Sequence, residues 1–174
     1  EKNKFTFITG TIIIMVINLL TLLGFVDTTA NMTLVTIRTV INAIATIIFF
    51  VAYAKFKTEP QLATICTSCL IVVYAVMILT NNHIVSYAFV FPIMLSVMLY
   101  LDVKFARWTA VIVGALNVIM CVKNFIVLPV ENQTSSLLQA CFAVLFCVIC
   151  DIVVRMQARH AEEATDALKS QMDT

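Results

Sequence analysis

Two basic side chains interrupt apolar stretches of this sequence, and both have amide neighbours. Arg38 lies about one turn inside its stretch and Asn42 follows four residues later, so the two share a face of a helix. Lys123 lies in another stretch, with Asn117 deeper in it. Charges inside a membrane are costly and usually functional, and a guanidinium matches a carboxylate, so we expect an outward-opening pocket for a small anionic or zwitterionic ligand. The residues expected to line it are Arg38, Asn42, His83, Tyr87, Asn117 and Lys123.

Two plainer interpretations of the same residues stay open. In the first, the two cations reach toward lipid headgroups on their aliphatic stems, while the asparagines join neighbouring helices. In the second, Asp27 and Glu131, which fall in outer segments, neutralise the cations. The choice depends on where the helices place these side chains.

Motifs for catalysis and for cofactor binding are missing from the sequence. No Asp or Glu lies in the middle of an apolar stretch, where a proton relay or ion-coupled carrier would need one. No glycine-rich phosphate loop, nucleophile elbow or HExxH motif occurs. We expect no enzymatic activity, no cofactor and no nucleic-acid partner.

Four cysteines form two CxxC pairs, Cys66 with Cys69 and Cys147 with Cys150. Both pairs fall in the inner halves of their stretches, which would permit a site of four thiolates. However, this spacing on a continuous helix is a poor chelating geometry, and cysteine also behaves as a small buried apolar residue. We therefore expect packing rather than a metal site.

The apolar stretches decide the fold class. Apolar residues make up 61% of the chain and charged residues 12%, and the charges gather between the stretches. A hydrocarbon core of about 30 Å needs about 20 apolar residues in a helix. We predict an all-α, polytopic membrane bundle of six transmembrane helices. Their expected ranges are 5–26, 34–54, 62–80, 84–101, 108–128 and 137–154.

Basic residues lie on one side of this expected bundle. Nine of the eleven Lys and Arg residues fall in alternate segments, and the outer segments 27–33, 81–83 and 129–136 hold none. The nine are Lys2, Lys4, Lys55, Lys57, Lys104, Arg107, Arg155, Arg159 and Lys169. Because basic loops stay in the cytoplasm, we expect a multi-pass protein of the cytoplasmic (inner) membrane, surrounded by its lipids, with both termini cytoplasmic.

The polar segment 155–174 follows the sixth stretch without Pro or Gly, so the helix should continue out of the membrane. Small and apolar residues recur in it at spacings of four and three, as in a short coiled-coil seam. The seam residues are Val154, Ala158, Ala161, Thr165, Leu168 and Met172. We predict two parts, a transmembrane bundle (1–154) and a cytoplasmic signalling helix (155–174) that starts a longer output module. A helix lying on the membrane surface is the alternative.

Three segments carry a resemblance to a known family. They are KNKFTF at 2–7, YAFVFPI at 87–93 and MLYLDVK at 98–104. Together with six short-looped spans and a polar heptad helix, they resemble the N-terminal sensor regions of methyl-accepting chemotaxis proteins from Clostridia-like bacteria. The resemblance implies a homodimeric sensor that binds a small ligand from outside and relays the change through the sixth helix.

Two other classes fit parts of the pattern. A membrane sensor attached to a histidine kinase or a nucleotide cyclase would have the same spans and exit helix. The substrate-binding subunit of a vitamin transporter matches the size and the six spans. Three glycines in 174 residues and a protruding helix count against the transporter subunit.

Overall fold

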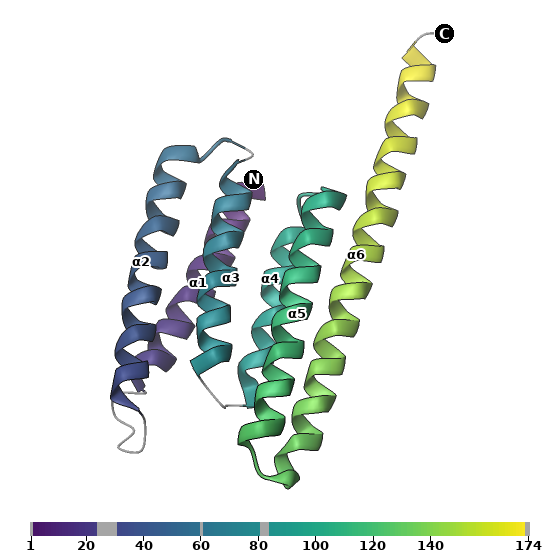
Figure 1. Ribbon diagram of the computed structural model, residues 1–174. Helices are drawn as coiled ribbons and strands as arrows, with labels where there is room; N and C mark the ends of the chain where they lie inside the picture. The colour runs from purple at the N-terminus through teal and green to yellow at the C-terminus, as the bar shows by residue number, and fades with distance from the viewer. Residues whose placement is uncertain (1, 24–30, 60, 81–83, 173–174) are drawn as a thin grey trace.

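The computed structural model describes residues 2–23, 31–59, 61–80 and 84–172. Nearly all of these residues are helical and none of them forms a β-strand, which confirms the all-α class (Figure 1). The elements are α1 (Lys2–Leu23), α2 (Met32–Phe56), α3 (Gln61–Thr80), η1 (Ile84–Phe89), α4 (Val90–Met98), α5 (Val103–Val127) and α6 (Val130–Met172).

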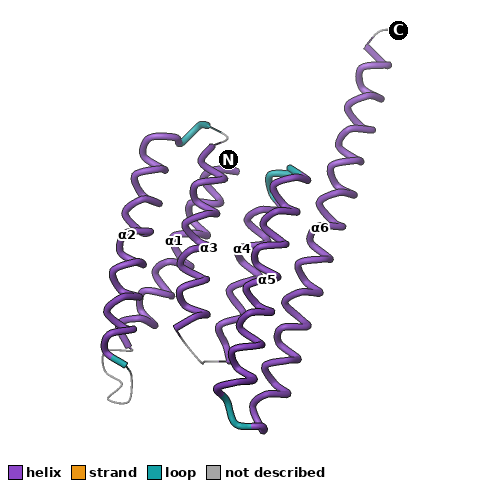
Figure 2. The backbone as a smooth tube through the Cα atoms, in the orientation of Figure 1, coloured by secondary structure: helices purple, strands orange, loops and turns teal. Residues whose placement is uncertain are grey.

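Successive helices run in opposite directions, so α1 begins at the end of the bundle beyond which α6 extends (Figure 1). The described connections between α4 and α5 and between α5 and α6 are short and lie at opposite ends of the bundle (Figure 2). Five helices, α1, α2, α3, α5 and α6, are long and apolar enough to cross a membrane. Their outward faces carry large apolar side chains, with exposed fractions of 80% at Ile126 and 65% at Met15. An apolar surface this extensive is suited to lipid and not to water, as in a multi-pass membrane protein.

The fourth apolar stretch is not the single helix expected over 84–101. It starts as the 3₁₀-helix η1, continues as the nine-residue α4 and ends at Met98. Pro92 lies in the first turn of α4, where it has no N–H to donate and its ring opposes α-helical geometry in the residues before it. Because a 3₁₀-helix rises about 2.0 Å per residue, η1 and α4 together reach roughly 26 Å. The stretch is therefore nearly as long as a hydrocarbon core of about 30 Å.

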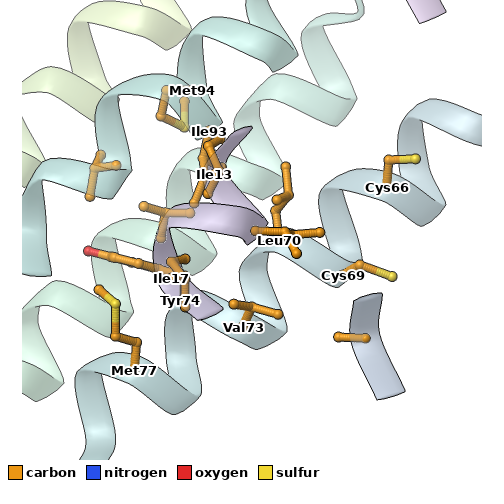
Figure 3. Packing of buried hydrophobic residues seen from close by; sticks show 14 of the residues in the cluster. Ile13, Ile17, Cys66, Cys69, Leu70, Val73, Tyr74, Met77, Ile93 and Met94 are labelled. Carbon is orange, nitrogen blue, oxygen red and sulfur yellow. The ribbon is translucent and has the colours of Figure 1, made fainter. Parts of the chain in front are cut away.

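Helix α3 is at the centre of the packing. It contacts α1, α2, α4 and α5. In Figure 3, Ile13 and Ile17 of α1 and Ile93 and Met94 of α4 gather in one buried cluster with the α3 face that carries Tyr74. Helices in lipid associate through close packing of this kind and through interhelical hydrogen bonds. α3 therefore joins α1 and α2 to the second half of the bundle.

Side-chain hydrogen bonds fix two connections to the start of α1. Asn3 donates from Nδ2 to the carbonyl oxygens of Lys57 and Glu59, both at 3.1 Å. The Tyr100 hydroxyl lies 3.1 Å from Asn3 Oδ1 and 2.8 Å from Thr6 Oγ1. Tyr100 lies in the turn after α4, and burial raises the pKa of its hydroxyl. The α2–α3 and α4–α5 connections are thus both held against α1.

Helix α5 begins at Val103, earlier than the expected 108, because Asp102 caps it. The Asp102 carboxylate accepts hydrogen bonds from the backbone N–H groups of Lys104 at 2.9 Å and Phe105 at 3.0 Å. Leu101, just before this cap, has a φ of 55°. That value lies in the left-handed region, where a Cβ atom is strained.

Leu101→Gly is expected to stabilise the folded bundle by about 1 kcal/mol, because glycine adopts this conformation without a steric cost. The matched control is Leu99→Gly, since Leu99 also ends α4 but has an ordinary φ of −65°. The free energy of unfolding in mixed detergent micelles measures both changes. A Leu101→Gly variant no more stable than the Leu99→Gly variant would contradict strain at Leu101.

Candidate functional site

The first polar cluster lies along α1 and α2 and contains Arg38 and Asn42. Both side chains are on the buried face of α2, with exposed fractions of 4% and 1%. The Thr46 hydroxyl donates to the carbonyl oxygen of Asn42 at 2.6 Å and accepts from Asn18 Nδ2 at 3.2 Å. With an exposed fraction of only 4%, the Arg38 side chain is enclosed by the protein.

The second polar cluster joins α3, α5 and α6. The Tyr74 hydroxyl donates to Asn117 Oδ1 at 3.0 Å, and Asn117 Nδ2 donates to the carbonyl oxygen of Val113 at 2.8 Å. Farther along α5, Asn124 Nδ2 donates to Ser136 Oγ of α6 at 2.9 Å. Asn117, predicted to line a pocket, thus also links α5 to α3, as asparagines do in membrane bundles.

Lys123 is a residue of α5, and its side chain reaches the C-terminal end of α3. Its ammonium donates to the carbonyl oxygens of Ile78 at 2.7 Å and Leu79 at 3.4 Å. The last carbonyls of a helix lack intrahelical donors and carry partial negative charge. Lys123 therefore caps α3, a role that the sequence could not indicate because backbone carbonyls have no residue-type signal.

The predicted site residues fall into two groups. α3 lies between α2, which carries Arg38 and Asn42, and α5, which carries Asn117 and Lys123 (Figure 1). Tyr87 and Asn117 line one space, which is too narrow to admit a water molecule. His83 and Asp27 lie outside the described residues.

The second cluster also holds two buried amide oxygens, Asn124 Oδ1 and Gln139 Oε1, that accept no hydrogen bond within the described part of the chain. A buried acceptor without a donor costs free energy. Gln139 lines the narrow space beside Tyr87 and Asn117. The two oxygens are therefore acceptors to which the described residues supply no donor.

The CxxC cysteines are parts of the apolar core. Cys66, Cys69, Cys147 and Cys150 are all buried and belong to one cluster of apolar side chains. Among the described residues, no three His, Cys, Asp or Glu side chains are placed to hold a metal ion. The four side chains therefore contribute to the packing of the core.

An apolar groove that no pattern in the sequence predicted runs between α4 and α6. It has a volume of about 370 Å³ and is lined by Tyr87, Phe91, Phe142, Leu145, Phe146 and Ile149. The rings of Phe91 and Phe146 lie 4.5 Å apart, centroid to centroid. The residues are on different helices, so only their packing reveals the groove.

Helix α6 leaves the bundle after Val154, which is fully buried in a cluster with Val97 and Ala106. Beyond this point the described side chains are exposed, apart from the half-buried Ala158. Leu168, for example, is 62% exposed. Val154 of the predicted seam thus packs inside the chain, and the surface available to a partner starts at Ala158.

No protein-family model, no curated protein and no solved structure matches this chain. The geometry of the bundle and its exit helix is therefore the basis for assigning a function.

Proposed function

We propose that this chain is the transmembrane sensory domain of a bacterial chemoreceptor-type signal transducer. The observation that carries the proposal is α6, a single helix of 43 residues that packs in the bundle and then extends beyond it (Figure 1). Its sequence has no glycine or proline between Val130 and Met172. A continuous helix passes a shift of its membrane part to its tail, whereas a flexible linker would absorb the shift.

Six crossings with both termini in the cytoplasm belong to this proposal. The helices alternate in direction, and the nine basic residues of the alternate segments lie toward the end from which α6 extends. The positive-inside rule assigns that end to the cytoplasm. η1 with α4 would form the fourth crossing, and local thinning of the bilayer accommodates its small deficit in length.

The signal would be a small anionic or zwitterionic ligand that enters from the opposite, outer end. A carboxylate would bind the Arg38 guanidinium. The acceptors of Asn124 and Gln139 are on the other side of α3, and they would take the ammonium group of a ligand bound there. Because the space beside Tyr87 and Asn117 is closed, binding would require the outer ends of the helices to separate. The ligand would shift this equilibrium by its higher affinity for the open state.

Hydrogen bonds provide a route from the outer end to α6. Tyr74 links α3 to Asn117 of α5, and Asn124 links α5 to Ser136 of α6. Each contact joins side chains on neighbouring helices, so a shift of α3 or α5 would move α6 as well.

A homodimer would form along the exposed part of the tail. Its seam consists of Ala158, Ala161, Thr165, Leu168 and Met172, and small residues let two helices approach closely. The ion pairs of the tail, Arg159–Glu163 at 3.0 Å and Lys169–Asp166 at 3.9 Å, use other positions. A short isolated helix is marginal in water, so pairing would stabilise it.

Single cysteines in the tail test this proposal by disulfide crosslinking in vesicles. Cys141, the exposed native cysteine, is first replaced by serine. We expect severalfold more crosslinking at Ala161 and Leu168, on the seam, than at their neighbours Glu162 and Lys169. Succinate and glycine, as an anionic and a zwitterionic probe, are then added, and at least one should change the crosslinking rate at Leu168.

Arg38→Gln separates ligand binding from assembly. The variant keeps a polar side chain but removes the charge, so the response to the probe should be lost while the seam preference remains. Equal crosslinking around the tail would exclude the dimer. A probe response that persists in Arg38→Gln would exclude Arg38 as the group that binds the ligand.

A further inference from the structure

Two guanidinium groups share one carboxylate at the end of the bundle from which the tail emerges. Arg107 Nε of α5 lies 3.7 Å from Asp151 Oδ1 of α6, and Arg155 pairs with Oδ2 of the same carboxylate. The Asp151 side chain is 13% exposed, whereas those of Arg107 and Arg155 are 55% and 51% exposed. The single negative charge is therefore covered, and the two positive charges remain at the surface.

Neighbouring residues on α5 place this pair of cations at the level of the membrane surface. Trp108, the single tryptophan of the chain, is 69% exposed and follows Arg107 directly. Tryptophan is enriched where the hydrocarbon meets the headgroups. Lys104 is exposed and lies about one helical turn before Trp108, on the same side of α5.

We infer that Arg107 and Arg155 form a binding site for the headgroup phosphate of an anionic phospholipid. A planar guanidinium donates two parallel hydrogen bonds to phosphate oxygens. Asp151 contacts both groups and so restricts their side-chain freedom before the lipid arrives, which lowers the entropic cost of binding.

The surface next to the cations indicates a lipid rather than free phosphate. Val111 of α5 and Ile152 of α6, on the membrane side of the pair, have exposed fractions of 57% and 49%. Acyl chains attached to the bound headgroup would lie along such apolar side chains, and a free phosphate would gain nothing from them. The lipid would contact α5 and the first turn of the tail together, at the point where Val154 makes the last buried contact of α6.

Trp108 fluorescence tests the site in the full chain. The protein is reconstituted in vesicles of equal parts phosphatidylcholine and phosphatidylglycerol, with brominated acyl chains on one lipid at a time. Bromine quenches tryptophan on contact, so the two experiments compare the lipids that touch Trp108, the residue next to Arg107. We expect stronger quenching by brominated phosphatidylglycerol, corresponding to an enrichment of about fivefold for each guanidinium.

Two variants distinguish this site from general attraction to a basic surface. Arg107→Gln leaves Asp151 paired with Arg155 and should lower the enrichment about fivefold. Arg159→Gln removes the same charge from the tail, where the Arg159 side chain is 81% exposed, and should leave the enrichment unchanged. Equal quenching by the two lipids, or equal losses in both variants, would overturn the site. Loss of the enrichment on adding inorganic phosphate, but not chloride of the same ionic strength, would assign the site to free phosphate instead.

Discussion

Gly10→Ala is expected to destabilise the bundle by about 1–3 kcal/mol. A Cβ atom at Gly10 would lie 2.5 Å from Cζ and 2.7 Å from Cε2 of Phe49, inside the contact distance of two carbon atoms. Phe49 is fully buried, and its ring stacks on Phe7 with centroids 5.5 Å apart and meets Phe50 edge-on at 5.9 Å. The ring therefore cannot turn away without disturbing the packing of α1 on α2.

Gly114→Ala is the matched control, with an effect of the opposite sign. A Cβ atom at Gly114 would meet nothing within 4 Å, and the residue lies in the middle of α5. Alanine there should stabilise the protein by up to about 1 kcal/mol, because glycine disfavours a helix. Unfolding by sodium dodecyl sulfate from mixed micelles measures both variants. A Gly10→Ala variant as stable as the unchanged protein would mean that α1 and α2 do not approach as closely as described.

Apolar run length predicted where most helices lie, because a helix in lipid must be apolar over the thickness of the core. The length of an apolar run did not predict the residues at which the helices begin and end. α5 starts at Val103 because Asp102 caps it, whereas the predicted span starts at Trp108. Hydropathy marks the depth of a residue in the membrane and not the end of a helix. The prediction of one continuous helix over 84–101 was wrong for a related reason. The length of an apolar run does not distinguish a 3₁₀-helix from an α-helix before Pro92.

The candidate site could be predicted only one helix at a time. The spacing of Arg38 and Asn42 indicated a shared face, and both are buried on one face of α2. Which helix covers that face could not be read from the sequence, because helices in lipid are apolar on the outward side as well as the inward side. For the same reason, the sequence could not predict that α3 lies between Arg38 and Lys123.

The hydrogen bond between Tyr74 and Asn117 should be the main polar link between α3 and α5. The Tyr74 side chain is fully buried and Asn117 is 2% exposed, so neither group can exchange its partner for water. Tyr74→Phe removes the hydroxyl that donates to Asn117 Oδ1 at 3.0 Å and leaves that oxygen buried without its donor. We expect a loss of about 1–2 kcal/mol in the free energy of unfolding.

Tyr53→Phe is the control for Tyr74→Phe, because the Tyr53 ring stacks on Phe7 at 3.6 Å and its hydroxyl makes no hydrogen bond within the described residues. The double variant Tyr74→Phe with Asn117→Leu removes both partners and should cost less than the sum of the two single changes, since no buried acceptor is then left unpaired. The free energy of unfolding in mixed micelles is measured for the unchanged protein, the two single variants and the double variant. If Tyr74→Phe costs no more than Tyr53→Phe, the hydroxyl contributes nothing to the contact, and α3 and α5 are held together by apolar packing and by the Lys123 cap alone.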